Sequence, residues 1–153
     1  MFILMEMSDT CIENAYICTS KDDAAQKMMA LIKKLLKPAG ENLFEIFSRM
    51  YDINVVIWAL AEECPERKKM YHELLKLEDE FENALLAAYK KKKLPSIIGS
   101  YYEPIGFSLD FNHNKAEKSV IGVEIRVETE GDWESEHLSY MSWKFIPASK
   151  WGE

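Results

Sequence analysis

The chain of 153 residues is long enough for a single domain that buries about two-thirds of the surface its unfolded form exposes, so it needs no disulfide or metal to fold. Its 48% hydrophobic and 29% charged content excludes disorder and provides no span for a membrane. The net charge of −7 argues against a nucleic-acid partner, whose phosphates require a basic surface, and favours a cationic one.

Three cysteines, Cys11, Cys18 and Cys64, lack the paired spacing of a zinc or redox site. We therefore expect small buried hydrophobic residues in a cytoplasmic protein, with no metal and no cofactor. The apolar opening at residues 1–5 is too short for a secretory signal and lacks its basic start. It is interpreted as a strand or a buried arm.

The first clear helix begins after Ser20, because Ser20 and Asp23 have capping-box spacing and apolar residues then recur every three or four positions. Residues 8–19 before it fit either a short helix or a ragged strand. A second amphipathic helix starts at Asn42. Residues 52–60 fit either a short central strand or, as their helix-forming flanks favour, a continuation of this helix that is buried on every side.

The longest helix is predicted over residues 65–93. Its apolar stripe consists of Met70, Leu74, Leu77, Phe81, Ala84, Leu85 and Ala88. Pro65 suits the first helical turn, and the four lysines at 90–93 suit the negative end of the helix dipole. Such a helix is either the spine of a helical layer, which the two preceding helices favour, or one half of a homodimer.

Three segments after a connector rich in Pro and Gly alternate apolar and polar residues, at 107–111, 123–127 and 141–145. They predict a three-stranded antiparallel meander. The fold class is therefore α+β, in one domain over residues 1–153. A helical part at about residues 1–94 packs on one face of a sheet at about residues 105–147, and the opening residues are an optional N-terminal strand.

No catalytic or metal-binding residue is predicted, because nucleotide-binding and nucleophile motifs such as G-x-x-x-x-G-K and G-x-S-x-G are absent from the sequence. His72 is expected on the polar side of the long helix. His113 and His137 fall in two loops about 30 Å apart, too far to share a metal ion. A pairing of Asp110 with His113, or of Glu136 with His137, leaves a small hydrolase as an alternative.

The polar face of the predicted meander and the acidic loop beside it form the candidate binding site. Its residues are Asp110, Glu124, Arg126, Glu128, Glu130, Asp132, Trp133, Glu134, Glu136, Tyr140 and Lys144. An acidic rim around an aromatic residue suits a partner protein with a basic surface. The sequence therefore predicts a small acidic protein-binding or inhibitory module that acts as an immunity protein would. A hydrolase and a homodimer through the long helix are the alternatives.

Overall fold

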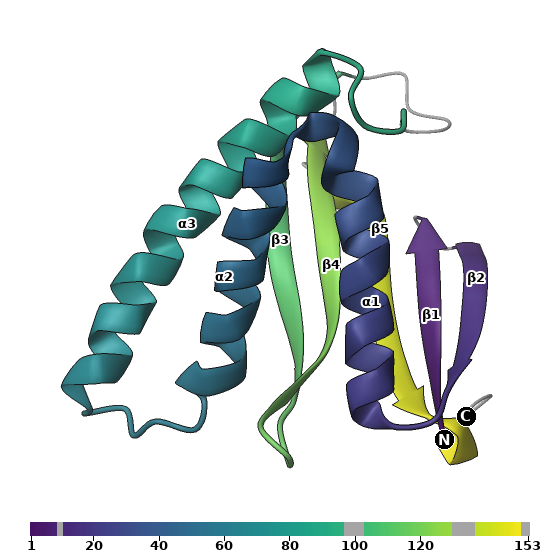
Figure 1. Cartoon of the computed structure of the whole chain (residues 1–153). Helices are drawn as coiled ribbons and strands as arrows, with labels where there is room; N and C mark the ends of the chain where they lie inside the picture. Colours follow the sequence, from purple (N-terminus) through teal and green to yellow (C-terminus); the bar gives the residue numbers. More distant parts are fainter. Residues whose placement is uncertain (9–10, 97–102, 130–136, 151–153) are drawn as a thin grey trace.

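The computed structural model describes residues 1–8, 11–96, 103–129 and 137–150 (Figure 1). In this part of the chain, two strands precede three helices and three further strands follow them. They are β1 (Phe2–Ser8), β2 (Cys11–Cys18), α1 (Lys21–Leu36), α2 (Glu41–Ile57), α3 (Pro65–Lys90), β3 (Pro104–Asn114), β4 (Ser119–Thr129) and β5 (His137–Pro147). Short 3-10 helices lie at Lys37–Ala39 and Ala148–Lys150.

The strands form one antiparallel sheet in the order β2-β1-β5-β4-β3. The α+β class is confirmed, and β3, β4 and β5 form the predicted meander. The optional N-terminal strand is present as β1, which pairs with β5, but the sheet has five strands because β2 pairs with β1 and extends it further. Within the segment 8–19, the described residues are thus mainly strand, and part of the segment assigned to the helical layer belongs to the sheet.

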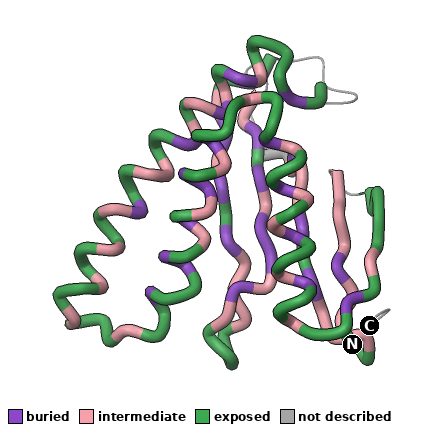
Figure 2. Tube along the Cα trace, viewed as in Figure 1, coloured by how far each residue is buried: buried purple, intermediate pink, exposed green. Residues whose placement is uncertain are grey.

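All three helices lie on the same face of the sheet (Figure 1). α1 contacts β1 and β5, α2 contacts β4, and α3 contacts β3. The strand residues that point toward the helices form the core, in which Trp143 and Phe145 are 0% and 2% exposed, as the alternating pattern predicts. Figure 2 shows these buried positions along the strands and on the inner sides of the helices.

The apolar stripe of α3 is confirmed, although the helix ends at Lys90. Leu74, Phe81, Leu85 and Ala88 are buried, and Phe81 contacts the Phe47 ring of α2 at 6.0 Å between centroids. Because this stripe packs inside the chain, α3 acts as the spine of the helical layer. The alternative was a homodimer in which two copies of the long helix pair through this stripe. In the structure, the stripe already contacts the core of its own chain.

The helical interpretation of residues 52–60 holds as far as Ile57, where α2 ends. The prediction that this segment is buried on every side is wrong. Ile53 and Ile57 are buried, but Val55, Val56 and Trp58 are 45%, 41% and 45% exposed. Only one side of α2 faces the core, so its other apolar residues remain in contact with solvent.

Candidate binding face

No described element covers the face of the sheet that points away from the helices. We call this surface the open sheet face. Leu4, Val123 and Phe145 point toward the helices, so their neighbours along each strand point the other way. The residues of this face are partly or largely exposed, with the exception of Gly122, which is buried. A five-stranded sheet with helices on one side thus presents its other side to solvent.

One half of the open sheet face is apolar. Its members are Ile3, Met5 and Met7 of β1, Ile12 and Ile17 of β2, and Ile146 of β5. Ile3 pairs with both Ile17 and Ile146, which places three isoleucines in one row across three strands. Ile17 is 77% exposed and Ile12 is 52% exposed. Contiguous exposed apolar side chains of this kind mark interaction surfaces.

The other half of the open sheet face is charged. Arg126 of β4 forms ion pairs with Glu124, at 2.5 Å, and with Asp110 of β3, at 3.6 Å. α3 lies against β3, and the Glu82 carboxylate accepts a hydrogen bond from the Leu109 backbone N–H at 3.4 Å. This contact satisfies a donor at the free edge of β3 and brings carboxylates of α3 next to those of the sheet.

Five carboxylates from three elements gather along this side, and we call them the acidic edge. They are Glu78 and Glu82 of α3, Asp110 of β3, and Glu124 and Glu128 of β4. Burial, and then the nearby charge of Asp110, raise the pKa of Glu78. Burial also raises the pKa of Glu82. The Leu109 N–H opposes that shift, and the negative charges of Glu78, Asp79 and Glu128 add to it.

Burial is thus the main cause of both raised pKa values, and neighbouring carboxylates add to it. Sequence reasoning missed Glu78 and Glu82, because the packing of α3 along β3 leaves no mark in the local pattern of either element.

Among the predicted site residues, Asp110, Glu124 and Arg126 come together on the open sheet face, as predicted. Glu128 lies near the C-terminal end of β4 and pairs with Gly106. Lys144 of β5 is exposed and pairs with Gly122. The remaining acidic residues and the tryptophan of the predicted loop lie outside the described residues. These are Glu130, Asp132, Trp133, Glu134 and Glu136.

The prediction that Tyr140 lies on the polar binding face is wrong, because Tyr140 is only 6% exposed and faces the core. Its ring packs edge-to-face against Phe107 and Tyr89, and its hydroxyl donates a hydrogen bond to the Pro95 carbonyl. The cause is an irregularity in register: Ile125 pairs with Met141, but Arg126 pairs with Ser139. Tyr140 is therefore the extra residue of a bulge, which reverses the face expected from simple alternation.

The prediction that His113 lies in a loop is wrong, because His113 is part of β3. Its ring contacts the Trp58 ring edge-on at 5.2 Å between centroids, and its buried Nε2 has no hydrogen-bond partner in the described part of the chain. The ion pair of Asp110 is with Arg126. His72 is exposed on α3, as expected.

Cys18 is buried, but Cys11 is exposed on β2, so the prediction of buried cysteines is wrong for Cys11. β2 is the outermost strand of the sheet and leaves this side chain uncovered.

Among the described residues, no group of three or more His, Cys, Asp or Glu side chains is placed to hold a metal ion. No described helix combines the length and the apolar character needed to cross a membrane.

Comparisons with protein-family models, with curated proteins and with solved structures found no match for this chain. The geometry of the open sheet face is therefore the basis for a functional hypothesis.

Proposed function

We propose that the chain is a protein-binding module that docks its open sheet face onto a partner protein with a basic and partly apolar surface. The observation that carries this proposal is the adjacency of the apolar half of that face to the acidic edge. Apolar burial would supply most of the binding free energy. The acidic edge would steer and orient a basic partner, since carboxylates of α3, β3 and β4 lie near one another there.

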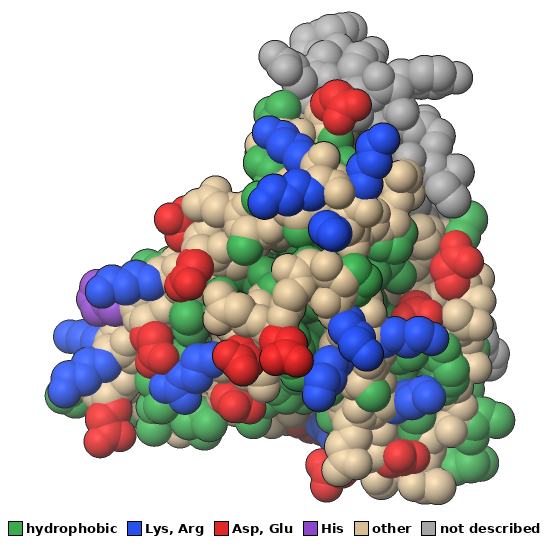
Figure 3. Space-filling view, turned by 45° about the horizontal axis from the view of Figure 1, so that its top comes forward, with side chains coloured by type: hydrophobic (Ala, Val, Ile, Leu, Met, Phe, Trp, Pro, Cys, Tyr) green, Lys and Arg blue, Asp and Glu red, His purple; other side chains and the backbone are tan. Residues whose placement is uncertain are grey.

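The helical side of the molecule contrasts with this arrangement. Figure 3 shows lysine, arginine, aspartate and glutamate side chains interspersed over the helices. Mixed charge of this kind is the ordinary surface of a folded domain. On the sheet side, charged and apolar residues are segregated. A partner protein bound there would have its own basic surface covered, which would block or inhibit it. An inhibitory action of the immunity-protein kind follows the same logic.

Affinity capture from the native lysate, followed by mass spectrometry, tests the proposal. The acidic-edge variant carries Asp110→Lys at the acidic edge and Asp79→Lys, whose charge acts on Glu82 of that edge. Another variant carries Ile12→Lys and Ile17→Lys in the apolar half. All four side chains are exposed, so folding should be retained. A matched control, Glu62→Lys with Glu63→Lys, makes the same charge change in the connection between α2 and α3.

We expect both open-face variants to capture at least about tenfold less of the partner than the wild type, while the control captures the same amount. The acidic-edge variant should also lose most of the salt dependence of capture. Equal capture by all variants at the same salt concentration would refute the proposal. An empty capture by the wild type would do so as well, and would favour the hydrolase alternative.

A further inference from the structure

A groove of about 890 Å³ lies where the open sheet face meets the turn between β3 and β4. Three lysines line it, Lys115 and Lys118 of the turn and Lys144 of β5. Met7 of β1, Ile121 of β4 and Trp58, directly after α2, contribute apolar walls. The groove thus draws side chains from four separate parts of the chain.

The hollow has a local structural cause. The pairing of β3 with β4 shifts register between Asn112 and His113, and the two strands twist strongly about each other toward their turn (Figure 1). Gly122 lies between Asn112 and Lys144 in the strand pairing. A Cβ at Gly122 would lie 2.5 Å from the Trp143 carbonyl oxygen, so only glycine is accommodated at this position between two residues that line the groove.

Three lysines give the groove a local excess of positive charge. Glu117, in the same turn, forms an ion pair with Lys21 at 2.6 Å, and Lys21 also donates to Ser119. Glu124, which lines the groove, is paired with Arg126. Lys115, Lys118 and Lys144 have no ion-pair partner among the described residues. A chain with a net charge of −7 therefore keeps three cationic side chains converging on one hollow.

The aromatic wall is held in place from two sides. The Arg67 guanidinium lies 5.4 Å from the centre of the Trp58 ring, and Arg67 also donates to the Leu60 carbonyl. The His113 ring contacts the same indole at 5.2 Å. A partly exposed tryptophan fixed in this way offers a preformed apolar contact to a ligand.

We infer that this groove binds a small organic anion. The lysines would hold its carboxylate or phosphate group, and Met7, Ile121 and Trp58 would contact its apolar body. The volume lies within the range of small-molecule sites, and the combination of apolar walls with a few convergent charges is typical of them. This inference goes beyond the proposed function, because the ligand binds without a protein partner.

The test uses three probes with the same ring system: 2-naphthyl phosphate, 2-naphthoate and neutral 2-naphthol. Each is titrated into the full chain, and binding is followed by NMR through the backbone amides of residues 113–122. The groove variant carries Lys115→Gln, Lys118→Gln and Lys144→Gln. The matched control carries Lys33→Gln, Lys34→Gln and Lys37→Gln, three exposed lysines beside the groove between α1 and α2.

We expect one or both anions to shift these amides and to bind at least about tenfold more tightly than 2-naphthol. The groove variant should lose at least about tenfold in affinity for the anion, whereas the control should match the wild type. Preference for 2-naphthyl phosphate or for 2-naphthoate would identify a phosphate ester or a carboxylate as the ligand.

Three results would overturn the inference. Neither anion shifts these amides at millimolar concentration, or 2-naphthol binds as tightly as the anions, or the control variant loses as much affinity as the groove variant. None of them depends on the partner protein, so the protein-binding proposal is tested separately.

Discussion

At the scale of single residues, Glu78 of the acidic edge shows how burial and a neighbouring charge act together on one carboxyl group. Its pKa is raised in the folded chain by burial and by Asp110, so folding disfavours its ionised form. The folded state therefore binds the proton more tightly than the unfolded state does. At a pH above the raised pKa, the ionised carboxylate of Glu78 lowers the free energy of unfolding.

We predict that Glu78→Gln raises the free energy of unfolding by about 0.5 kcal/mol at neutral pH, because it removes a partly buried charge and, secondarily, its repulsion from Asp110 and from Glu82 one turn away. The gain shrinks as pH falls through the raised pKa and disappears below the ordinary value of 4.5. Urea unfolding at neutral pH and near pH 4 measures it. Glu80→Gln, on the exposed side of α3, should change nothing, so equal gains in both variants would contradict the account.

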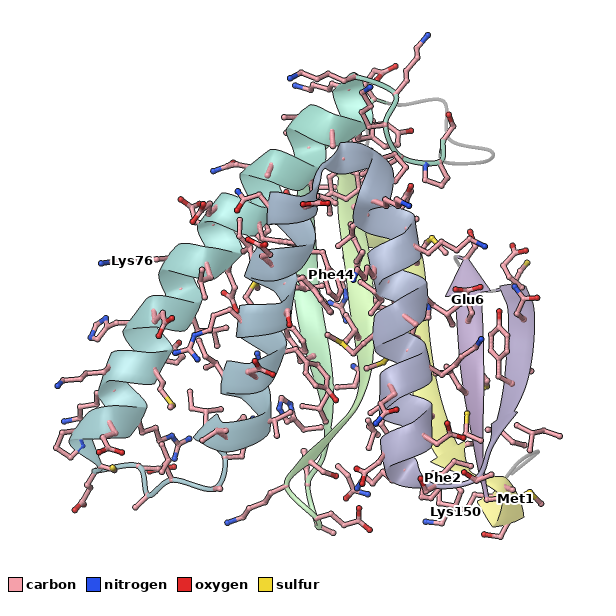
Figure 4. All side chains as sticks on the ribbon, in the orientation of Figure 1. Met1, Phe2, Glu6, Phe44, Lys76 and Lys150 are labelled. Atoms are coloured by element: carbon pink, nitrogen blue, oxygen red, sulfur yellow. The ribbon has the colours of Figure 1, made fainter. Side chains whose placement is uncertain are left out.

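Among the elements, β1 is held to its two neighbours partly through one side chain, Glu6 (Figure 4). Its carboxylate accepts a hydrogen bond from the Trp143 indole N–H of β5 at 2.8 Å and another from the Asn14 amide of β2 at 3.0 Å. Trp143 is fully buried, so its N–H depends on this partner.

Glu6→Ala should lower the free energy of unfolding by about 1–3 kcal/mol, because it leaves the buried indole donor without an acceptor. Chemical denaturation followed by tryptophan fluorescence measures the loss. Glu13→Ala, at an exposed position of β2, is the control and should cost much less. Similar stability of the Glu6→Ala variant and the wild type would show that the hydrogen bond does not join β1 to β5.

The elements also show what the sequence can predict. The strands at 107–111, 123–127 and 141–145 were predicted because one face is covered and the other is not, which produces clean alternation. β1 was predicted only as an optional strand and β2 only as one of two alternatives, because Ile3, Met5 and Ile17 make their outer face apolar as well and erase that contrast. Tyr140 was misplaced because a bulge, which is a property of strand pairing, changes the face of one residue.

At the scale of the whole molecule, local sequence patterns could predict only part of the site, because they do not show which distant elements lie side by side. Alternation alone placed Asp110, Glu124 and Arg126 together on one face. The contribution of α3 to the acidic edge and the lysine groove both arise from elements far apart in sequence. Lys115 and Lys144, for example, line the same groove only because β5 lies beside β4. No local pattern contains that information.

The account depends on a sheet that is covered on one face only. Methionine methyl NMR with a soluble nitroxide tests this most directly, since methionines lie on both sides of the sheet. We predict strong broadening of the Met5 and Met7 methyl signals and sharp signals for Met28 and Met50, which are 0% exposed. Met5 and Met7 signals as protected as those of Met28 would show that the open sheet face is covered, and would contradict the account.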